Sequence, residues 1–182
     1  MTELKQKLLN KTIMKKAGIG VGFVIATILL PQIFHSFGAA GTVFLPMHIP
    51  VLLVGFLLGP VYGMAVGAVS PMISSYLTGM PQEFPVMPIM VLELATYGLV
   101  SGLLSKHTKL PVIVSLFIAM FAGRISYAVG YYSIRAFFLP EITEKISPVN
   151  ALVTGIPGVL IQGILITIVV MYLKRRGNRK NV

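Results

Sequence analysis

The chain is a succession of apolar runs separated by short stretches that contain proline, glycine or charge. This pattern predicts six helices, because a membrane-spanning helix needs about 20 apolar residues and turn signals interrupt each run. We expect the helices near residues 13–33, 46–58, 60–77, 86–105, 111–138 and 148–173. Gly59 and Pro60 predict a tight reversal between the second and third helices, since proline suits the first position of a helix. The stretch 78–85 holds turn-forming residues and Glu83, which indicates a loop.

Composition narrows the fold class. Of the 182 residues, 55% are hydrophobic and 11% are charged, against about 25% charged residues in a soluble domain. We therefore predict an all-α integral membrane protein with a single six-helix domain over residues 1–182, a length that leaves no room for a second, soluble domain. The sequence has no cysteine, so disulfides and thiolate metal sites are excluded.

The positive charges predict the topology. A net charge of +10 would suggest nucleic-acid binding in a soluble protein, but here membrane lipid is the expected partner. With six spans and both termini cytoplasmic, twelve of the 15 Lys and Arg residues lie inside, as the positive-inside rule requires. They lie in the basic N-terminus (1–12) and at Lys15 and Lys16, in the loop with Lys106 and Lys109, and in the basic tail (174–182). In an alternative reading residues 1–40 are a cleaved signal peptide, which would leave five spans and lose this charge pattern.

Polar residues of the predicted helices gather toward the outer side of the membrane. Once each helix is given a direction, the inner half holds no intramembrane charge. This asymmetry predicts a polar cup that opens outward, whereas a channel needs a polar path on both sides. The alternative is that these side chains only face lipid headgroups. Among them are His48, Ser74, Glu93, Tyr131, Arg135 and Asn150.

Arg124 is the most informative of the polar residues. It stands about 20 Å into its helix, near mid-membrane, where an arginine costs about 2.5–3.5 kcal/mol and should face a partner or a wet cavity. Tyr127, Tyr131 and Arg135 follow at spacings of three, four and four, so all four side chains share one helix face. A guanidinium matches a carboxylate in two-pronged fashion, which favours an organic acid as ligand. The alternative is a buried ion pair between Arg124 and Glu93, and the two roles are compatible.

Other chemistry-bearing residues point to no reaction. His48 lies between two prolines at the start of the second helix, where lining a pocket and capping the helix end are equal alternatives. The sequence has no HExxH motif, nucleophile elbow or Walker P-loop. Glu93 is the only carboxylate within the predicted spans, so a paired-carboxylate or metal site is not available there. We expect neither catalysis nor a cofactor.

Glycine spacing predicts close helix packing in two places. Gly18, Gly22 and Ala26 form a small-residue face on the first helix, which suits either a subunit-docking surface or internal packing. Small residues recur at the same spacing of four through the second and third helices, at Gly55, Gly59, Gly63 and Gly67. The second series predicts a tightly packed inner floor.

The stretch PVLLVGFLLGPVYGMAVG, residues 50–67, resembles the second and third helices of the substrate-binding S components of energy-coupling factor (ECF) vitamin transporters. The resemblance extends over most of the chain through its length, spans, basic ends and small-residue first helix. It implies a binding cup near the outer face, lidded by loops such as 34–43 and 79–85. It also implies a transmembrane coupling subunit and two cytoplasmic ATPases as partners, and a bacterial plasma membrane. The family usually docks through an AxxxA motif, and glycine replaces alanine here at Gly18 and Gly22.

Within that family, FLPMHIPVLL (44–53) and SSYLTGMP (74–81) look most like the pantothenate branch. Cobalamin, folate and other vitamins are alternative ligands, because Arg124 suits the glutamate of folate as well as the carboxylate of pantothenate. An alternative of another class is a self-sufficient carrier or channel, driven by an ion gradient through Glu93 and Arg124. Copurification separates the two classes, because only an S component requires ATPase partners.

Overall fold

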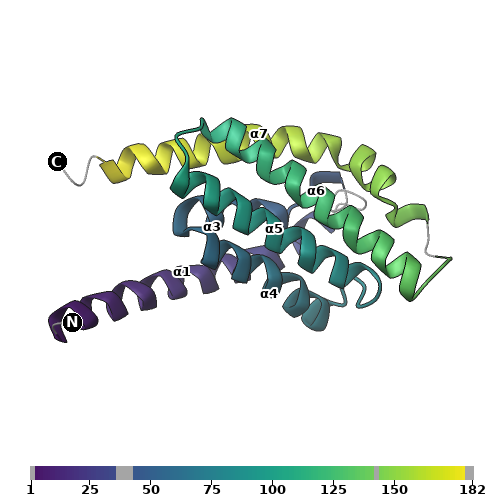
Figure 1. Ribbon diagram of the computed structural model, residues 1–182, viewed down its shortest axis with the longest axis horizontal. Helices are drawn as coiled ribbons and strands as arrows, with labels where there is room; N and C mark the ends of the chain where they lie inside the picture. The colour runs from purple at the N-terminus through teal and green to yellow at the C-terminus, as the bar shows by residue number, and fades with distance from the viewer. Residues whose placement is uncertain (1–2, 36–42, 142–143, 179–182) are drawn as a thin grey trace.

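The protein is a bundle of α-helices in a computed structural model that describes residues 3–35, 43–141 and 144–178 (Figure 1). No strand occurs in these residues, so the predicted all-α class is confirmed. The elements are α1 (Glu3–His35), α3 (His48–Leu58), α4 (Pro60–Thr78), α5 (Val86–His107), α6 (Val112–Phe137), the 3-10 turn η1 (Glu144–Ile146) and α7 (Pro148–Asn178).

Most helix ends agree with the sequence prediction to within two residues, but α1 and α7 are longer. α1 begins at Glu3 instead of residue 13, and α7 continues to Asn178 instead of residue 173. The added residues are mainly Lys, Arg, Leu and Gln, which favour helix even where no apolar face is needed. The predicted basic N-terminus is therefore largely the first turns of α1. Residues 1–2 and 179–182 lie outside the described residues.

In the part of the chain that the structure describes, four helices are long and apolar enough to cross a membrane: α1, α5, α6 and α7. α3 is apolar but has only 11 residues, about 17 Å at 1.5 Å per residue. It is buried on most sides, as expected of a helix that is hydrophobic all round. Four candidate spans indicate a multi-pass membrane protein, and the six-span topology stays a prediction.

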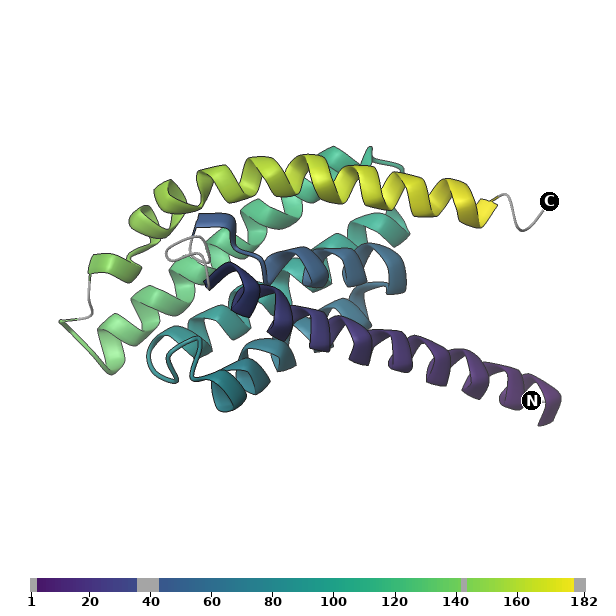
Figure 2. The same ribbon diagram turned by 180° about the vertical axis from the view of Figure 1, so that it is seen from behind.

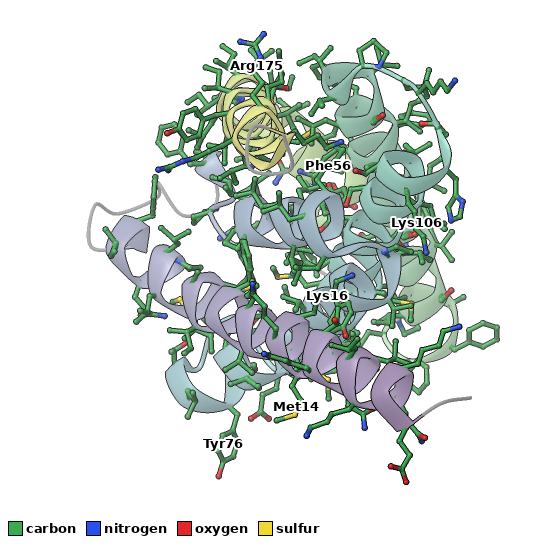
Figure 3. The ribbon with its side chains drawn as sticks, turned by 90° about the vertical axis from the view of Figure 1, so that its left-hand side faces the viewer. Met14, Lys16, Phe56, Tyr76, Lys106 and Arg175 are labelled. Atoms are coloured by element: carbon green, nitrogen blue, oxygen red, sulfur yellow. The ribbon has the colours of Figure 1, made fainter. Side chains whose placement is uncertain are left out.

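Glycine contacts join α3, α4 and α5 into a tightly packed core. A Cβ atom added to Gly55 of α3 would lie 2.6 Å from the carbonyl oxygen of Gly98 in α5. Gly63 and Gly98 likewise face each other backbone to backbone, and Gly67 lies against the carbonyl of Leu94. The predicted close packing of this region is confirmed. Figure 3, which views the bundle from one end, shows Phe56 of α3 in the interior and Tyr76 of α4 pointing away from the helices.

The turn between α3 and α4 shows why the Gly-Pro pair matters. α3 ends at Leu58, Gly59 has φ +98°, and Pro60 is the first residue of α4. A positive φ of this kind is open to glycine and unfavourable for most other residues. The reversal predicted at these two residues is confirmed.

The first turns of α1 and the last turns of α7 lie at the same end of the bundle. Figure 1 shows both at the left, with the end of α6 and the start of α7 toward the opposite end. α1, with 33 residues, is about 50 Å long and exceeds the roughly 30 Å hydrocarbon core of a bilayer. Its N-terminal turns extend beyond the other helices.

Candidate functional site

A cavity of about 700 Å³ is lined by the C-terminal end of α1 and the N-terminal ends of α3, α5 and α7, so it lies away from the first turns of α1 and the last turns of α7. Its walls come from six places: Pro31 near the end of α1, the chain leading into α3, the turn after α4, one face of α5, one face of α6, and the region from η1 into α7. Its lining is mainly apolar, with polar groups at a few positions. The lining includes Leu45, Met47, His48, Met80, Gln82, Met90, Glu93, Arg124, Tyr127, Lys145, Ile146, Asn150 and Thr154. A mostly apolar pocket with a few polar groups is the usual form of a small-molecule site.

A buried ion pair forms the polar centre of the cavity. Arg124 Nη1 lies 3.0 Å from Oε1 of Glu93, and the Tyr97 hydroxyl donates a hydrogen bond of 2.9 Å to the same oxygen. The Glu93 side chain is 2% exposed, so its charge depends on these partners rather than on water. Of the two predicted roles for Arg124, the pairing with Glu93 is therefore present.

Hydrogen-bonding capacity remains beside this pair. His48 Nε2 lies 3.6 Å from Glu93 Oε2, too far for a hydrogen bond. Both ring nitrogens of His48 are buried, and so is Arg124 Nη2. None of these three atoms has a hydrogen-bond partner among the described residues. Buried polar atoms are normally satisfied. His48 and Arg124 both line the cavity.

A glycine of α7 makes room for the arginine. A Cβ atom at Gly155 would lie 2.8 Å from Arg124 Nη2 and 3.0 Å from Leu45 Cδ1. The guanidinium and the Leu45 side chain therefore both lie against the α7 backbone at Gly155.

The turn η1 is held over the cavity by two side chains. The Tyr127 hydroxyl donates a hydrogen bond of 2.8 Å to the carbonyl of Ile146. Asn150 Nδ2 donates one of 2.7 Å to the carbonyl of Lys145. Tyr127 and Asn150 both line the cavity, and Lys145 joins them there. The two predicted residues thus contribute to the cavity wall and also fix its covering turn.

Ser74 is fully buried beside the cavity and supports a second wall. Its hydroxyl donates a hydrogen bond of 2.7 Å to the carbonyl of Met80, and Thr78 Oγ1 donates one of 3.2 Å to the same carbonyl. Met80 lines the cavity, whereas Ser74 does not. The contact of Ser74 with the cavity is therefore indirect.

Two residues predicted on the same face of α6 lie away from the cavity. Tyr131 is 1% exposed and packs with Ile89, Tyr127 and Ile134, so it belongs to a small apolar cluster. Arg135 is exposed near the end of α6, and neither residue lines the cavity.

Three polar residues around the cavity were not singled out as site residues from the sequence. Lys145, in the turn η1, lines the cavity. Tyr97 binds Glu93, and its position four residues later on the same helix was a detectable signal. Gln162 is a single polar residue in a long apolar run, which is the kind of signal that marks a role inside a membrane helix.

Of the two lid loops implied by the resemblance, the structure describes 79–85 in full and 34–43 only at its ends. Residues 79–82 line the cavity. Most of the other lid, residues 36–42, lies outside the described residues.

A family profile described as "ECF transporter, substrate-specific component" matches residues 16–174 of the chain. The protein belongs to this family. It is thus the substrate-specific membrane subunit of an ECF transporter, a binding subunit rather than an enzyme. Neither the curated proteins nor the solved structures include a match to the chain.

The small-residue face of this S component points away from its own bundle. Gly18 and Gly22 are exposed, and a Cβ atom added to either would meet no described atom within 4 Å. Ala26 is half-buried. Gly20, on the other side of α1, is buried and lies near Val66 of α4. Internal packing therefore uses the Gly20 side of the helix and leaves Gly18 and Gly22 open.

Proposed function

We propose that this S component binds an anionic vitamin such as pantothenate in the 700 Å³ cavity. In this role it is the substrate-binding subunit of a transporter that takes up the vitamin at the expense of ATP. The observation that carries this proposal is Arg124 at the cavity, with one guanidinium nitrogen bound to Glu93 and the other without an acceptor among the described residues. A guanidinium has five N–H donors, so one carboxylate oxygen of Glu93 leaves several for a ligand. The ring nitrogens of His48 add a second polar contact, and the apolar lining accommodates the alkyl part.

The direction of uptake follows from charge. The basic segments 5–16, 106–109 and 174–176 belong to the end with the chain termini, and the cavity lies toward the other end. The positive-inside rule assigns the basic end to the cytoplasm. We therefore propose that both termini are cytoplasmic and that the cavity loads from outside the bacterial plasma membrane.

Arg124→Met is expected to weaken pantothenate binding by roughly tenfold to a hundredfold, because a hydrogen bond to a charged group contributes about 1.5–3 kcal/mol. Panthenol, which has an alcohol in place of the carboxylate, should bind the unmodified protein more weakly and lose little further affinity on mutation. Isothermal titration calorimetry in detergent measures both dissociation constants.

Arg135→Met is the matched control, because it removes an exposed arginine of the same helix that does not line the cavity. Its affinity for both compounds should stay unchanged. Equal losses for acid and alcohol in Arg124→Met would contradict the carboxylate contact and leave only the structural pair with Glu93.

The partners that we propose are an ECF transmembrane coupling subunit and two cytoplasmic ATPases, with Gly18, Gly22 and Ala26 as the docking face. Gly22→Leu is expected to abolish copurification of these subunits, because the added bulk holds the two helix backbones apart. Pantothenate affinity of the isolated subunit should stay within about twofold, since nothing in the described chain lies within 4 Å of a Cβ at Gly22.

Ala136→Leu supplies the control for added bulk, because Ala136 is a small exposed residue on α6. Copurification should survive in that variant. Loss of pantothenate binding or of folded protein in Gly22→Leu would assign the face to internal packing instead. Purification of the unmodified protein without any ATPase would favour a self-sufficient carrier.

The identity of the ligand is tested directly by mass spectrometry of small molecules released from purified, denatured protein. Pantothenate in the released fraction supports the proposed branch. Cobalamin, folate or another vitamin there would retain the transport role and replace the ligand.

A further inference from the structure

Gln162 ties α7 to the chain that leads into α3. Its side chain is fully buried, and Nε2 donates hydrogen bonds of 3.0 Å to the carbonyl of Phe44 and 3.2 Å to that of Leu45. More than 100 residues of sequence separate the partners. Gln162 does not line the cavity, whereas Leu45 does. Figure 2 shows this chain passing next to α7 before α3 begins.

Gly155 and Gly158 of α7 allow residues 43–45 to lie close to that helix. Gly155, Gly158 and Gln162 follow at spacings of three and four, so they share one face of α7. A Cβ atom at Gly158 would lie 2.5 Å from the carbonyl oxygen of Val43. At Gly155 it would be 3.0 Å from Leu45 Cδ1. Residues 43–45 therefore lie directly on the α7 backbone.

The backbone conformation of Leu45 needs stabilising contacts of this kind. Leu45 has φ +50°, the only positive φ at a non-glycine residue among those described. Side-chain-bearing residues seldom adopt this conformation unless surrounding contacts impose it. The two hydrogen bonds from Gln162 end on the carbonyl groups of Leu45 and the residue before it, where they can impose it.

The position of Leu45 in turn affects Arg124. Leu45 Cδ1 and Arg124 Nη2 both lie close to the same glycine, Gly155, and this guanidinium nitrogen is buried and has no acceptor in the described chain. The Arg124 side chain is 13% exposed overall while its Nη2 atom is buried, and a charge shielded from water interacts more strongly with an anion.

We propose that Gln162 is a positioning residue of the binding site: from α7 it holds Leu45 in its place beside Gly155, where Arg124 also lies, and so sets the preference for an anionic ligand. We call the two hydrogen bonds from Gln162 to the Phe44 and Leu45 carbonyls the tether. The effect on anion binding rests on the proposed function, whereas the tether does not. Two measurements test these parts separately.

The first measurement reports the tether without any ligand. The protein has no cysteine, so a single Leu45→Cys substitution gives one reactive thiol. Combining it with Gln162→Met, which keeps the side-chain size and removes both donors, should raise the rate of maleimide labelling about tenfold. Met80→Cys reports the opposite wall, which Ser74 and Thr78 hold, and its labelling rate should not change with Gln162→Met.

Thr167→Val is the control on α7 itself, because it removes a buried hydroxyl that has no partner in the described chain. It should leave both labelling rates unchanged. If Gln162→Met does not accumulate, Gly158→Ala displaces the same segment by pressing on Val43 and should give the same acceleration. An equal rise at Leu45→Cys and Met80→Cys, or no rise at Leu45→Cys, overturns the tether.

The second measurement concerns the anion. In the protein with its native Leu45, Gln162→Met should reduce the ratio of pantothenate to panthenol affinity about tenfold, whereas general loosening of the fold would weaken both compounds alike and contradict the positioning role. If the unmodified protein binds neither compound, pantothenate is the wrong ligand, and the labelling rates alone then decide whether Gln162 positions Leu45.

Discussion

Glu93→Met is expected to lower the free energy of unfolding by about 3–5 kcal/mol, because it leaves the Arg124 charge buried without its partner. The carboxylate oxygen that is lost also accepts the hydrogen bond from Tyr97. Titration of the purified protein in mixed micelles with a denaturing detergent measures the change. Arg124→Met should destabilise the protein less, because the buried Glu93 side chain can take up a proton and become neutral, whereas an arginine cannot lose its charge.

The double variant Glu93→Met with Arg124→Met separates a coupled pair from two independent contributions. Replacing both charges by apolar side chains of similar size is often neutral, so most of the stability should return. Tyr97→Phe in the double-variant background removes the remaining unmatched hydroxyl and should restore more. Additive losses in the double variant would show that the ion pair contributes little as a pair.

Gly98→Ala is expected to prevent normal packing of α3, α4 and α5 and to destabilise the protein by more than about 3 kcal/mol, the upper end of ordinary overpacking. The added methyl group would meet the carbonyl of Gly63, and both groups belong to helix backbones that cannot change rotamer. Size-exclusion chromatography and the unfolding midpoint measure the loss of folded monomer.

Gly22→Ala adds the same methyl group to another exposed helix position, where no described atom lies within 4 Å. It should be as stable as the unmodified protein, or slightly more stable because alanine favours helix. A folded Gly98→Ala protein with normal stability would mean that the helix pair separates at little cost in free energy.

The helices could be predicted because each is an apolar run bounded by proline, glycine or charged residues. Gly59 and Pro60 mark one boundary sharply, and a glycine with positive φ lies there. The starts and ends that were missed belong to charged turns of α1 and α7, where helix propensity continues after the apolar pattern stops. The short α3 shows a further limit, because an apolar run indicates burial but does not decide between lipid and protein as the surroundings.

For the site, helix periodicity predicted which side chains share a helix face. It did not predict how far along the helix axis the cavity extends. Arg135 shares a face with Arg124, yet 11 residues of helix place them about 16 Å apart along the axis, beyond the extent of the cavity. Glu93 could be named as the partner of Arg124 because it is the only carboxylate in the predicted spans. Gln162 and its two carbonyl acceptors lie more than 100 residues apart, a contact that only the folded chain creates.

Three segments of the cavity wall are fastened by side chains of neighbouring helices. Ser74 and Thr78 of α4 hold the turn at Met80, Tyr127 of α6 holds η1, and Gln162 of α7 holds the segment at Leu45. All three fastenings end on main-chain carbonyls, so the lining side chains can change without breaking them. Such a scaffold allows selection to alter one wall at a time. A shift of substrate within this lineage would then proceed by replacement of a few lining residues, while the glycine-packed helices beneath remain as they are.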